Sequence, residues 1–233
     1  MKIKLYYGSG AASLCVHWML IEMGIDFEAV KIDLSNNEQK GEAYLKINPQ
    51  GKVPALELDG NVYTESVALV MLLSEHSERL KPAVGTDEHA RWTELLIYFA
   101  NSLLPAFREW FYAPVESGGN KEKETFLKDL VRPRIEAVYD RIEALLADGR
   151  THLLGNQLRS VDFVGTMLMR WSRNMPKPAT QWPNINKYVH RMRSMPSFIE
   201  VYKREEIKVK LLIKLKMITH LFHFKMEIKK YDK

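Results

Sequence analysis

The chain has 233 residues, of which 46% are hydrophobic, which is enough for two modest domains with full cores and without covalent staples. Its formal charge of +5 comes from the C-terminal segment. Residues 203–233 hold ten basic and four acidic side chains, whereas residues 1–202 hold 24 basic and 25 acidic side chains. A nearly neutral body argues against a broad nucleic-acid-binding face, since duplex binding depends on neutralising phosphates.

The chain begins with a strand, a helix and a second strand. Ile3–Tyr7 alternate as a strand and lack the long apolar core of a signal peptide. An apolar helix over Ser13–Met23 ends at Gly24, and Phe27–Ile32 is the second predicted strand. The two strands should be parallel with a right-handed crossover, which places residues 11–15 at the end of the first strand.

Two residues of this first helix bear on compartment and metal binding. The single cysteine, Cys15, excludes an internal disulfide and agrees with a reducing compartment. His17 has no second histidine at metal-ligand spacing, so it is predicted to be a packed residue and no metal site is expected.

No apolar run reaches the ~18 residues of a membrane-spanning helix. We therefore expect a cytoplasmic protein without a transmembrane segment.

A short helix and a turn come next. Ser35 and Glu38 have the spacing of a capping box, which predicts a helix that continues to about Lys46 and is ended by Asn48-Pro49. Gly51 then permits a tight turn. Val53-Pro54 stands at the start of a strand, where proline leaves neighbouring backbone groups without ladder partners, so these groups are free to pair with a ligand.

A hairpin and a helix complete the first unit. Ala55–Leu58 should pair with Val62-Tyr63 through the turn Asp59-Gly60-Asn61. Thr64-Glu65-Ser66 then opens a helix that continues to about Ser74. Its hydroxyls suit helix capping, and a helix N-terminus also favours an anionic group, so the pattern leaves a simple cap and an anion site open. The order βαβαββα predicts a thioredoxin-like domain over residues 1–77.

The remainder is predicted to be helical. Residues 78–86, with Pro82 and Gly85, are a linker, and residues 87–206 form an all-helical second domain. The expected helices are Asp87 to about Arg108, Lys121–Ala147, Val161–Arg173, Trp182–Ser194 and Phe198–Glu206. Residues 207–233 form a basic, apolar tail whose pattern fits two strands or one helical stripe equally well. Such a tail could lie on a membrane surface, cover a partner or be an extension without function.

Two segments carry a resemblance to a known family. Leu5-Tyr6-Tyr7-Gly8-Ser9-Gly10-Ala11-Ala12-Ser13-Leu14 and the stretch from Asn48 to Ser66 resemble the glutathione S-transferases, most closely their bacterial beta-class members. The similarity covers approximately residues 3–202. It implies a cis Val53-Pro54 bond and a valine that binds the cysteinyl backbone of glutathione. It also implies that Glu65 and Ser66 hold the γ-glutamyl end, with Ala12 and Lys52 beside the tripeptide.

Catalysis depends on a donor for the glutathione sulfur, because the thiolate is the nucleophile. The resemblance places a cysteine at Ala12 in beta-class enzymes, and alanine can form no mixed disulfide. Ser13 is then the first candidate donor and Tyr7 the second, with Tyr6 structural. Cys15 is a further alternative, although an isolated apolar-flanked cysteine is usually a core residue. Backbone amides at the helix start remain open as well.

The second domain departs further from the beta-class pattern. Leu104 and Pro105 replace a histidine and a lysine that often approach the sulfur in that class. Arg159 stands where the family commonly has a capping Ser or Thr before Ser160-Val161-Asp162, although Asp162 could satisfy first-turn amides. Four aromatic residues follow the departure and are candidates for an apolar electrophile pocket, the alternative being plain core packing: Phe107, Trp110, Phe111 and Tyr112.

The sequence therefore predicts a cytoplasmic, homodimeric glutathione transferase with a role in detoxification. It would join the glutathione thiolate to small, largely apolar electrophiles, with glutathione as co-substrate and no tightly bound cofactor or metal. Two alternatives stay open. One is a glutathione-dependent peroxidase or disulfide reductase, which Ala12 disfavours. The other is a transferase-like binding or regulatory protein without turnover, which Leu104 and Pro105 keep open.

Overall fold

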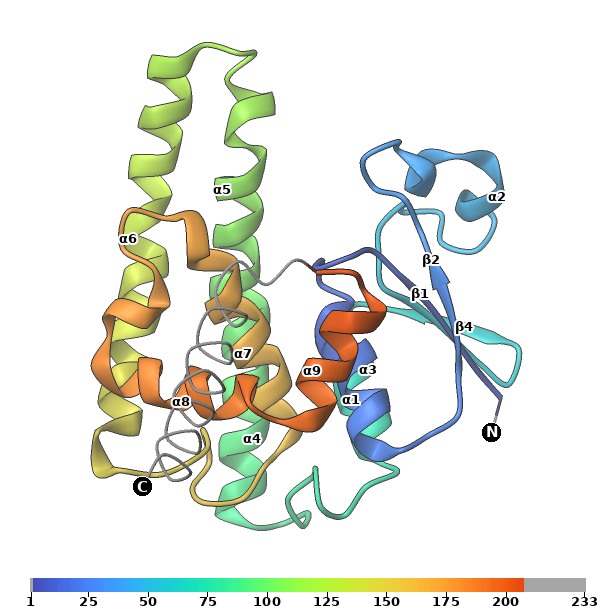
Figure 1. The fold of residues 1–233 in the computed structure, drawn as a ribbon, viewed down its shortest axis with the longest axis vertical. Helices are drawn as coiled ribbons and strands as arrows, with labels where there is room; N and C mark the ends of the chain where they lie inside the picture. Colours follow the sequence, from blue (N-terminus) through green and yellow to red (C-terminus); the bar gives the residue numbers. More distant parts are fainter. Residues whose placement is uncertain (1, 208–233) are drawn as a thin grey trace, which may run out of the picture.

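A sheet lobe and a helical lobe lie side by side in the computed structural model, which describes residues 2–207 (Figure 1). In the sheet lobe, β1 (Ile3–Tyr7) pairs in parallel with β2 (Glu28–Lys31) and antiparallel with β3 (Ala55–Leu58), which pairs with β4 (Asn61–Thr64). The strand order is β2-β1-β3-β4. Helices α1 (Leu14–Met23), α2 (Glu42–Leu45) and α3 (Ser66–Ser74) complete the lobe, and the predicted thioredoxin-like fold is confirmed.

Local turn chemistry explains the boundaries of these elements. Gly24 has φ 65° and ends α1 in the left-handed conformation that glycine adopts without steric cost. Asp59 and Gly60 both have positive φ, and Leu58 pairs with Asn61 across them. This is the two-residue turn that Asp-Gly favours, so the predicted hairpin is confirmed.

The expected capping box at Ser35 and Glu38 is wrong. The Ser35 hydroxyl donates to the Asp33 carboxylate at 2.5 Å, and the Glu38 carboxylate accepts from the Asp33 N–H at 2.6 Å. Asp33 thus takes the capping role from Ser35, since aspartate side chains readily bind backbone groups in turns. The segment splits into a 3₁₀ turn (Glu38–Lys40) and the short α2, separated by an extended Gly41.

The helical lobe contains the predicted helices with one extension. Its elements are α4 (Asp87–Tyr98), α5 (Leu104–Glu116), α6 (Lys121–Leu145), α7 (Ser160–Trp171), α8 (Pro183–Arg193) and α9 (Pro196–Arg204), with 3₁₀ turns at Leu146–Asp148, Ser172–Asn174 and Ala179–Gln181. A π-helical turn, Phe99–Leu103, joins α4 to α5, so the helix continues to Glu116 rather than ending near Arg108. Pro105 has no N–H to bond the preceding turn, and the wider π turn accommodates that loss.

The lobes are held together by α1, which packs against α7 and α9 (Figure 1). Trp18 of α1 is buried between Phe163 and Phe198, with ring centroids 4.6 and 4.9 Å away. The buried Ser160 hydroxyl accepts from Trp92 Nε1 at 2.9 Å and from the Ser74 hydroxyl at 2.7 Å. One side chain of α7 therefore fixes α3 and α4 together.

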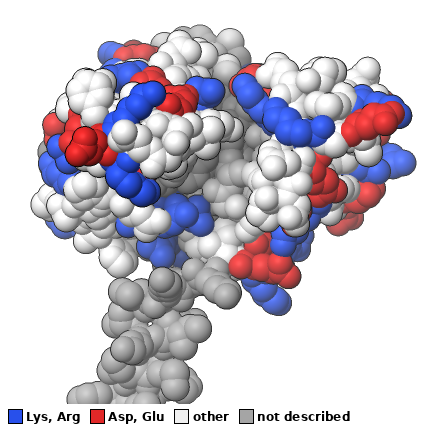
Figure 2. Space-filling view, turned by 90° about the horizontal axis from the view of Figure 1, so that it is seen from above, with Lys and Arg blue, Asp and Glu red and all other residues white. Residues whose placement is uncertain are grey.

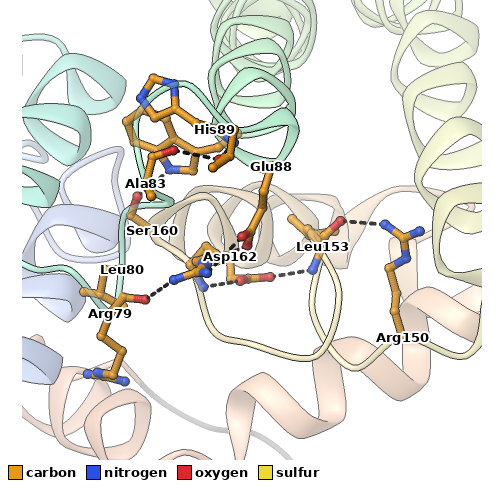
Figure 3. Close-up of polar contacts among 12 residues, drawn as sticks. Arg79, Leu80, Ala83, Glu88, His89, Arg150, Leu153, Ser160 and Asp162 are labelled. Carbon is orange, nitrogen blue, oxygen red and sulfur yellow. Dashed lines mark hydrogen bonds and ion pairs between the residues drawn. The ribbon is translucent and has the colours of Figure 1, made fainter.

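Arg159 precedes α7 and connects it to the linker. Figure 3 shows Arg79 of the linker, Glu88 of α4 and Asp162 of α7 in this region. The Arg159 guanidinium forms two hydrogen bonds with the Glu88 carboxylate, at 2.7 and 3.0 Å, and donates to the Arg79 carbonyl at 2.8 Å. The buried Asp162 carboxylate accepts from the N–H groups of Arg159 and Leu153 rather than from first-turn amides as expected. Arg159 thus holds the linker and α4 against the start of α7.

The end of the chain is described only as far as Ile207, whose N–H donates to the Tyr202 carbonyl at 2.9 Å. The two alternatives for the tail, helix or strands, concern residues 208–233, which lie outside the described residues. None of the helices seen in residues 2–207 combines the length and apolarity needed to cross a membrane. Over the same residues, no group of acidic, histidine or cysteine side chains is arranged to hold a metal ion.

Candidate functional site

The loop before β3 presents a backbone edge. The Lys52 carbonyl accepts hydrogen bonds from the Tyr44 hydroxyl and from Asn48 Nδ2, both at 2.7 Å. Burial raises the pKa of Tyr44 to about 12, so its hydroxyl remains a donor at neutral pH. The Val53-Pro54 peptide bond is cis, and the Val53 N–H and C=O have no partner among residues 2–207. Two fixed side chains therefore hold an unpaired peptide group at the surface.

The start of α3 lies directly after β4 and is not capped by a side chain. Glu65 occupies the N-cap with φ 67° and ψ 107°, and no side-chain cap hydrogen bond is present. The Ser66 side chain is buried, whereas Glu65 is exposed. The first amides of a helix have no partner within the helix. The simple-cap alternative is therefore wrong, and the N-terminus of α3 is open to an anionic group.

Ser13 lies at the junction between the β1–α1 loop and α1. Its side chain is 0% exposed, and its hydroxyl accepts from the Gly8 N–H and donates to the Gly8 carbonyl, each at 3.1 Å. The amides of Ala12 and Ser13 have no hydrogen-bond partner within the described chain, and Ala12 is partly exposed. The hydroxyl is engaged with the loop, while the two amides at the helix start are unpaired, that of Ala12 in a partly exposed residue and that of Ser13 in a buried one.

The other sulfur-donor candidates are buried and remain protonated at neutral pH. Burial raises the pKa of Cys15 to about 12, and its thiol donates to the Ala12 carbonyl at 3.3 Å. Burial first and then the charge of Glu205 raise the pKa of Tyr7, whose ring packs 4.7 Å from that of His17. Tyr6 lies apart from this group. Its ring packs edge to face against that of Tyr44, with the ring centroids 6.0 Å apart.

A carboxylate from the far end of the chain fixes the β1–α1 loop. The buried Glu205 lies 2.9 Å from His17 Nδ1, and its other oxygen accepts from the Gly10 N–H at 2.7 Å. Its carbonyl accepts from the Ser9 hydroxyl at 2.5 Å. Sequence reasoning missed Glu205, because no local pattern marks a partner that is 195 positions away from Gly10.

Trp171 is a second residue that the sequence did not single out. Its Nε1 donates to the Gly10 carbonyl at 3.1 Å, and its ring lies 5.6 Å from those of Phe107 and Phe111. Phe107 is fully buried, whereas Phe111 is 44% exposed. These three rings form an aromatic group beside the β1–α1 loop. In the sequence, only its position at the end of an apolar helix could have drawn attention to Trp171.

The predicted electrophile-pocket residues do not all meet. Trp110 lies on another face of α5, where the Lys128 ammonium of α6 is 5.5 Å from its ring. Tyr112 is exposed, with the Arg108 guanidinium 4.8 Å from its ring. Phe107 and Phe111, four residues apart, share the face toward Trp171 because helix positions i and i+4 are neighbours.

A hollow separates the helical lobe from the sheet lobe (Figure 2). A different groove, of about 520 Å³, lies along α4 and the end of α6. It contains none of the predicted site residues. Its Arg91 and Arg141 pair with Glu94, so its charges are already neutralised from within.

Family models match most of the chain. The model described as glutathione S-transferase, N-terminal domain, matches residues 12–76, and the model for the C-terminal domain of the same proteins matches residues 94–196. The two matches cover α1, the hairpin and most of the helical lobe.

Individual relatives agree with the family models. Glutathione S-transferase GstA of Escherichia coli O157:H7 is 28% identical over 210 residues, which is 88% of this chain and 100% of that protein. A glutathione transferase structure from Methylococcus capsulatus is 30% identical with a TM-score of 0.74, covering 88% of this chain and 100% of the other. A sphingomonad glutathione S-transferase complexed with glutathione is also 30% identical, with the same coverage and a TM-score of 0.76.

Proposed function

Because this chain belongs to the glutathione S-transferase family, we propose that it is a cytoplasmic transferase that joins glutathione to small, largely apolar electrophiles. The observation that carries this proposal is the unpaired Val53 peptide group beside the uncapped N-terminus of α3. Together they offer a peptide-pairing edge and an anion site, which a tripeptide with a free γ-glutamyl carboxylate requires. No tightly bound cofactor or metal is needed.

In this proposal the sheet lobe binds glutathione. The Val53 N–H and C=O pair with its cysteinyl backbone, and the N-terminus of α3 with Glu65 and Ser66 holds its γ-glutamyl end. The exposed Lys52 lies beside the tripeptide, and the bonds from Tyr44 and Asn48 to the Lys52 carbonyl support this edge. A preformed edge of this kind binds without a large ordering cost.

The sulfur would be held at the start of α1. The unpaired amides of the partly exposed Ala12 and the buried Ser13, together with the positive end of the α1 dipole, favour a thiolate there. The Ser13 hydroxyl, engaged with Gly8, would hold the loop and reach the sulfur only by giving up its bond to the Gly8 carbonyl. The thiolate attacks the electrophilic carbon, a sulfur–carbon bond forms, and the leaving group departs with its bonding electrons. The thiol proton passes to solvent.

Ala12 favours transfer over redox chemistry. We propose a beta-class-like member in which Ala12 stands in place of the usual cysteine. A reductase or peroxidase of that class would use a protein thiol at this place, and Cys15 is buried with its pKa raised to about 12. The electrophile would lie against Phe111 and Trp171, with Phe107 behind them, while Trp110 lies on another face of α5 and Tyr112 is exposed beside Arg108.

We also propose a homodimer. Phe126, Leu130, Pro133 and Ala137 recur at spacings of four and three along α6, and all are exposed. This spacing forms one apolar stripe on the helix surface, which a second copy could cover.

Calorimetric titration with glutathione, followed by chlorodinitrobenzene conjugation on the same sample, tests the function. We expect binding and turnover. No binding at millimolar glutathione would reject the transferase and the reductase together. Binding without conjugation would favour the non-catalytic alternative, which Leu104 and Pro105 keep open.

A further inference from the structure

Three arginines converge on one phenol next to the β1–α1 loop. Arg170 lies in the last turn of α7, Arg173 follows that helix, and Arg193 ends α8. The Arg170 guanidinium lies 5.4 Å from the ring centre of Tyr202 on α9, and Arg173 Nη1 is 3.4 Å from the Arg170 carbonyl. All three positive charges act to lower the pKa of Tyr202, although burial of this phenol raises it overall. Arg170 and Arg173 therefore lie together at the end of α7, and the charge of Arg193 is near enough to act on the same phenol.

Within residues 2–207 these arginines form no ion pair, and the Glu205 carboxylate, which lies across Gly10 from Arg170, accepts from the Gly10 N–H. None of the three arginines has a carboxylate within 4.0 Å there, although every other arginine of the described chain except Arg191 forms an ion pair. Among the described residues, Arg193 Nε is buried and has no hydrogen-bond partner. Burial and the charge of Arg170 lower the pKa of Arg173. Like charges and an unpartnered buried donor are costly unless an anion joins them.

The cluster is linked to the aromatic group by Gly10. The Gly10 carbonyl accepts from Arg170 Nη1 at 3.3 Å and from Trp171 Nε1 at 3.1 Å. One carbonyl thus joins a guanidinium of the cluster to the ring that lies against Phe111. Gly10 has φ 66°, and a Cβ there would lie 2.9 Å from Arg170 Nη2, so glycine permits this close approach. Figure 2 shows basic side chains at the edge of the hollow between the lobes.

We propose that Arg170, Arg173 and Arg193 bind the carboxylate or sulfonate of an anionic electrophile whose apolar part lies against Trp171 and Phe111. Guanidinium groups match such oxyanions through parallel, charge-assisted hydrogen bonds. This inference rests on the proposed transferase function and narrows its substrate class to aromatic electrophiles that carry a negative group. Arg170 holds the loop and the anion together, whereas Arg173 and Arg193 bind the anion alone.

The test compares chlorodinitrobenzene with its carboxylated analogue chlorodinitrobenzoate. For Arg173→Gln and Arg193→Gln we expect the KM of the benzoate to rise roughly tenfold, as loss of a charge-assisted hydrogen bond entails, with the KM of the neutral compound and of glutathione unchanged. Arg204→Gln removes the same charge from an exposed ion pair with Glu200 and is the matched control. It should leave all three KM values unchanged.

Direct binding separates this inference from the function itself. Calorimetry with nitrobenzoate, in the absence of glutathione, should show binding to the wild type and to Arg204→Gln and weaker binding to Arg173→Gln. Inorganic sulfate should compete with nitrobenzoate, and this arm gives a result even if no turnover is found. No nitrobenzoate binding to the wild type, or equal losses in Arg173→Gln and Arg204→Gln, would overturn the anion site. Sulfate binding without nitrobenzoate binding would assign the cluster to a free oxyanion and overturn the substrate proposal.

Discussion

At the scale of single residues, the first question is which group stabilises the thiolate. If the open amides of Ala12 and Ser13 do so, removing either nearby hydroxyl leaves the thiolate in place. We expect Ser13→Ala and Tyr7→Phe to keep the ultraviolet absorbance of bound thiolate at neutral pH. Ser13→Ala should still unfold more easily, by about 1–3 kcal/mol, because the Gly8 N–H and carbonyl lose a buried partner.

Tyr7→Phe is the matched control, since it removes a hydroxyl beside the same loop without touching Gly8. Loss of the thiolate absorbance in Ser13→Ala alone would restore the serine hydroxyl as the sulfur donor. Loss in Tyr7→Phe alone would assign that role to the tyrosine.

Asp162 gives a prediction for pH dependence. Burial is the largest influence on its carboxyl and raises its pKa from 3.8 to about 6, against the hydrogen bonds from Arg159, Leu153 and Tyr188. A carboxyl whose pKa is raised by folding contributes stability below its unfolded pKa and loses that contribution as pH rises through the folded value. The contribution of Asp162 to the free energy of unfolding of the wild type should therefore fall as the pH rises from about 4 to about 6.

Asp162→Asn removes that titration. An amide has one acceptor oxygen, so it cannot serve both N–H groups, and we expect a loss of about 1–3 kcal/mol. Urea unfolding at several pH values measures both effects. A variant whose free energy of unfolding still follows the wild-type pH curve would contradict the assignment to Asp162.

At the scale of elements, the β1–α1 loop is fixed by helices from the other lobe. Glu205 accepts from the Gly10 N–H, and Trp171 donates to the Gly10 carbonyl, so both sides of one residue are held. We expect Glu205→Gln to raise the KM of glutathione several-fold and to shift the pH at which bound glutathione ionises, because one carboxylate acceptor is lost.

Glu206→Gln is the control for this change. Glu206 is the next residue and forms an exposed ion pair with Lys31, so its loss should alter neither quantity. A Glu205→Gln variant that unfolds more easily but keeps the wild-type ionisation of bound glutathione would reduce Glu205 to a structural residue.

Local signals explain how much of these elements could be predicted. The Asp59-Gly60 turn and the Gly24 cap depend on backbone preferences of single residues, and both are confirmed. The Ser35 capping box failed because Asp33, two positions earlier, competes for the same backbone groups. Glu205 and Trp171 could not be found, since their contacts with Gly10 appear only once α7 and α9 are packed against α1.

At the scale of the whole molecule, the fold accommodates two residues that the sequence marked as unusual. Arg159 forms hydrogen bonds with Glu88 and with the Arg79 carbonyl, and these hold the linker and α4 against the start of α7. Pro105 follows the π turn, and α5 continues beyond it to Glu116. Both residues are therefore compatible with the complete fold.

The exposed stripe on α6 gives the last prediction. Leu130 is 58% exposed, so Leu130→Asp should not disturb the core of one subunit, whereas a carboxylate buried between two copies without a partner would be costly. We expect sedimentation velocity to show a dimer for the wild type and a monomer for Leu130→Asp. Val84→Asp is the matched control, because Val84 is an exposed apolar residue of the linker, at 74%. It should remain dimeric. If the neighbouring subunit completes the glutathione site, the Leu130→Asp monomer should also bind glutathione more weakly. A Leu130→Asp variant that sediments as a dimer would place the interface on another face.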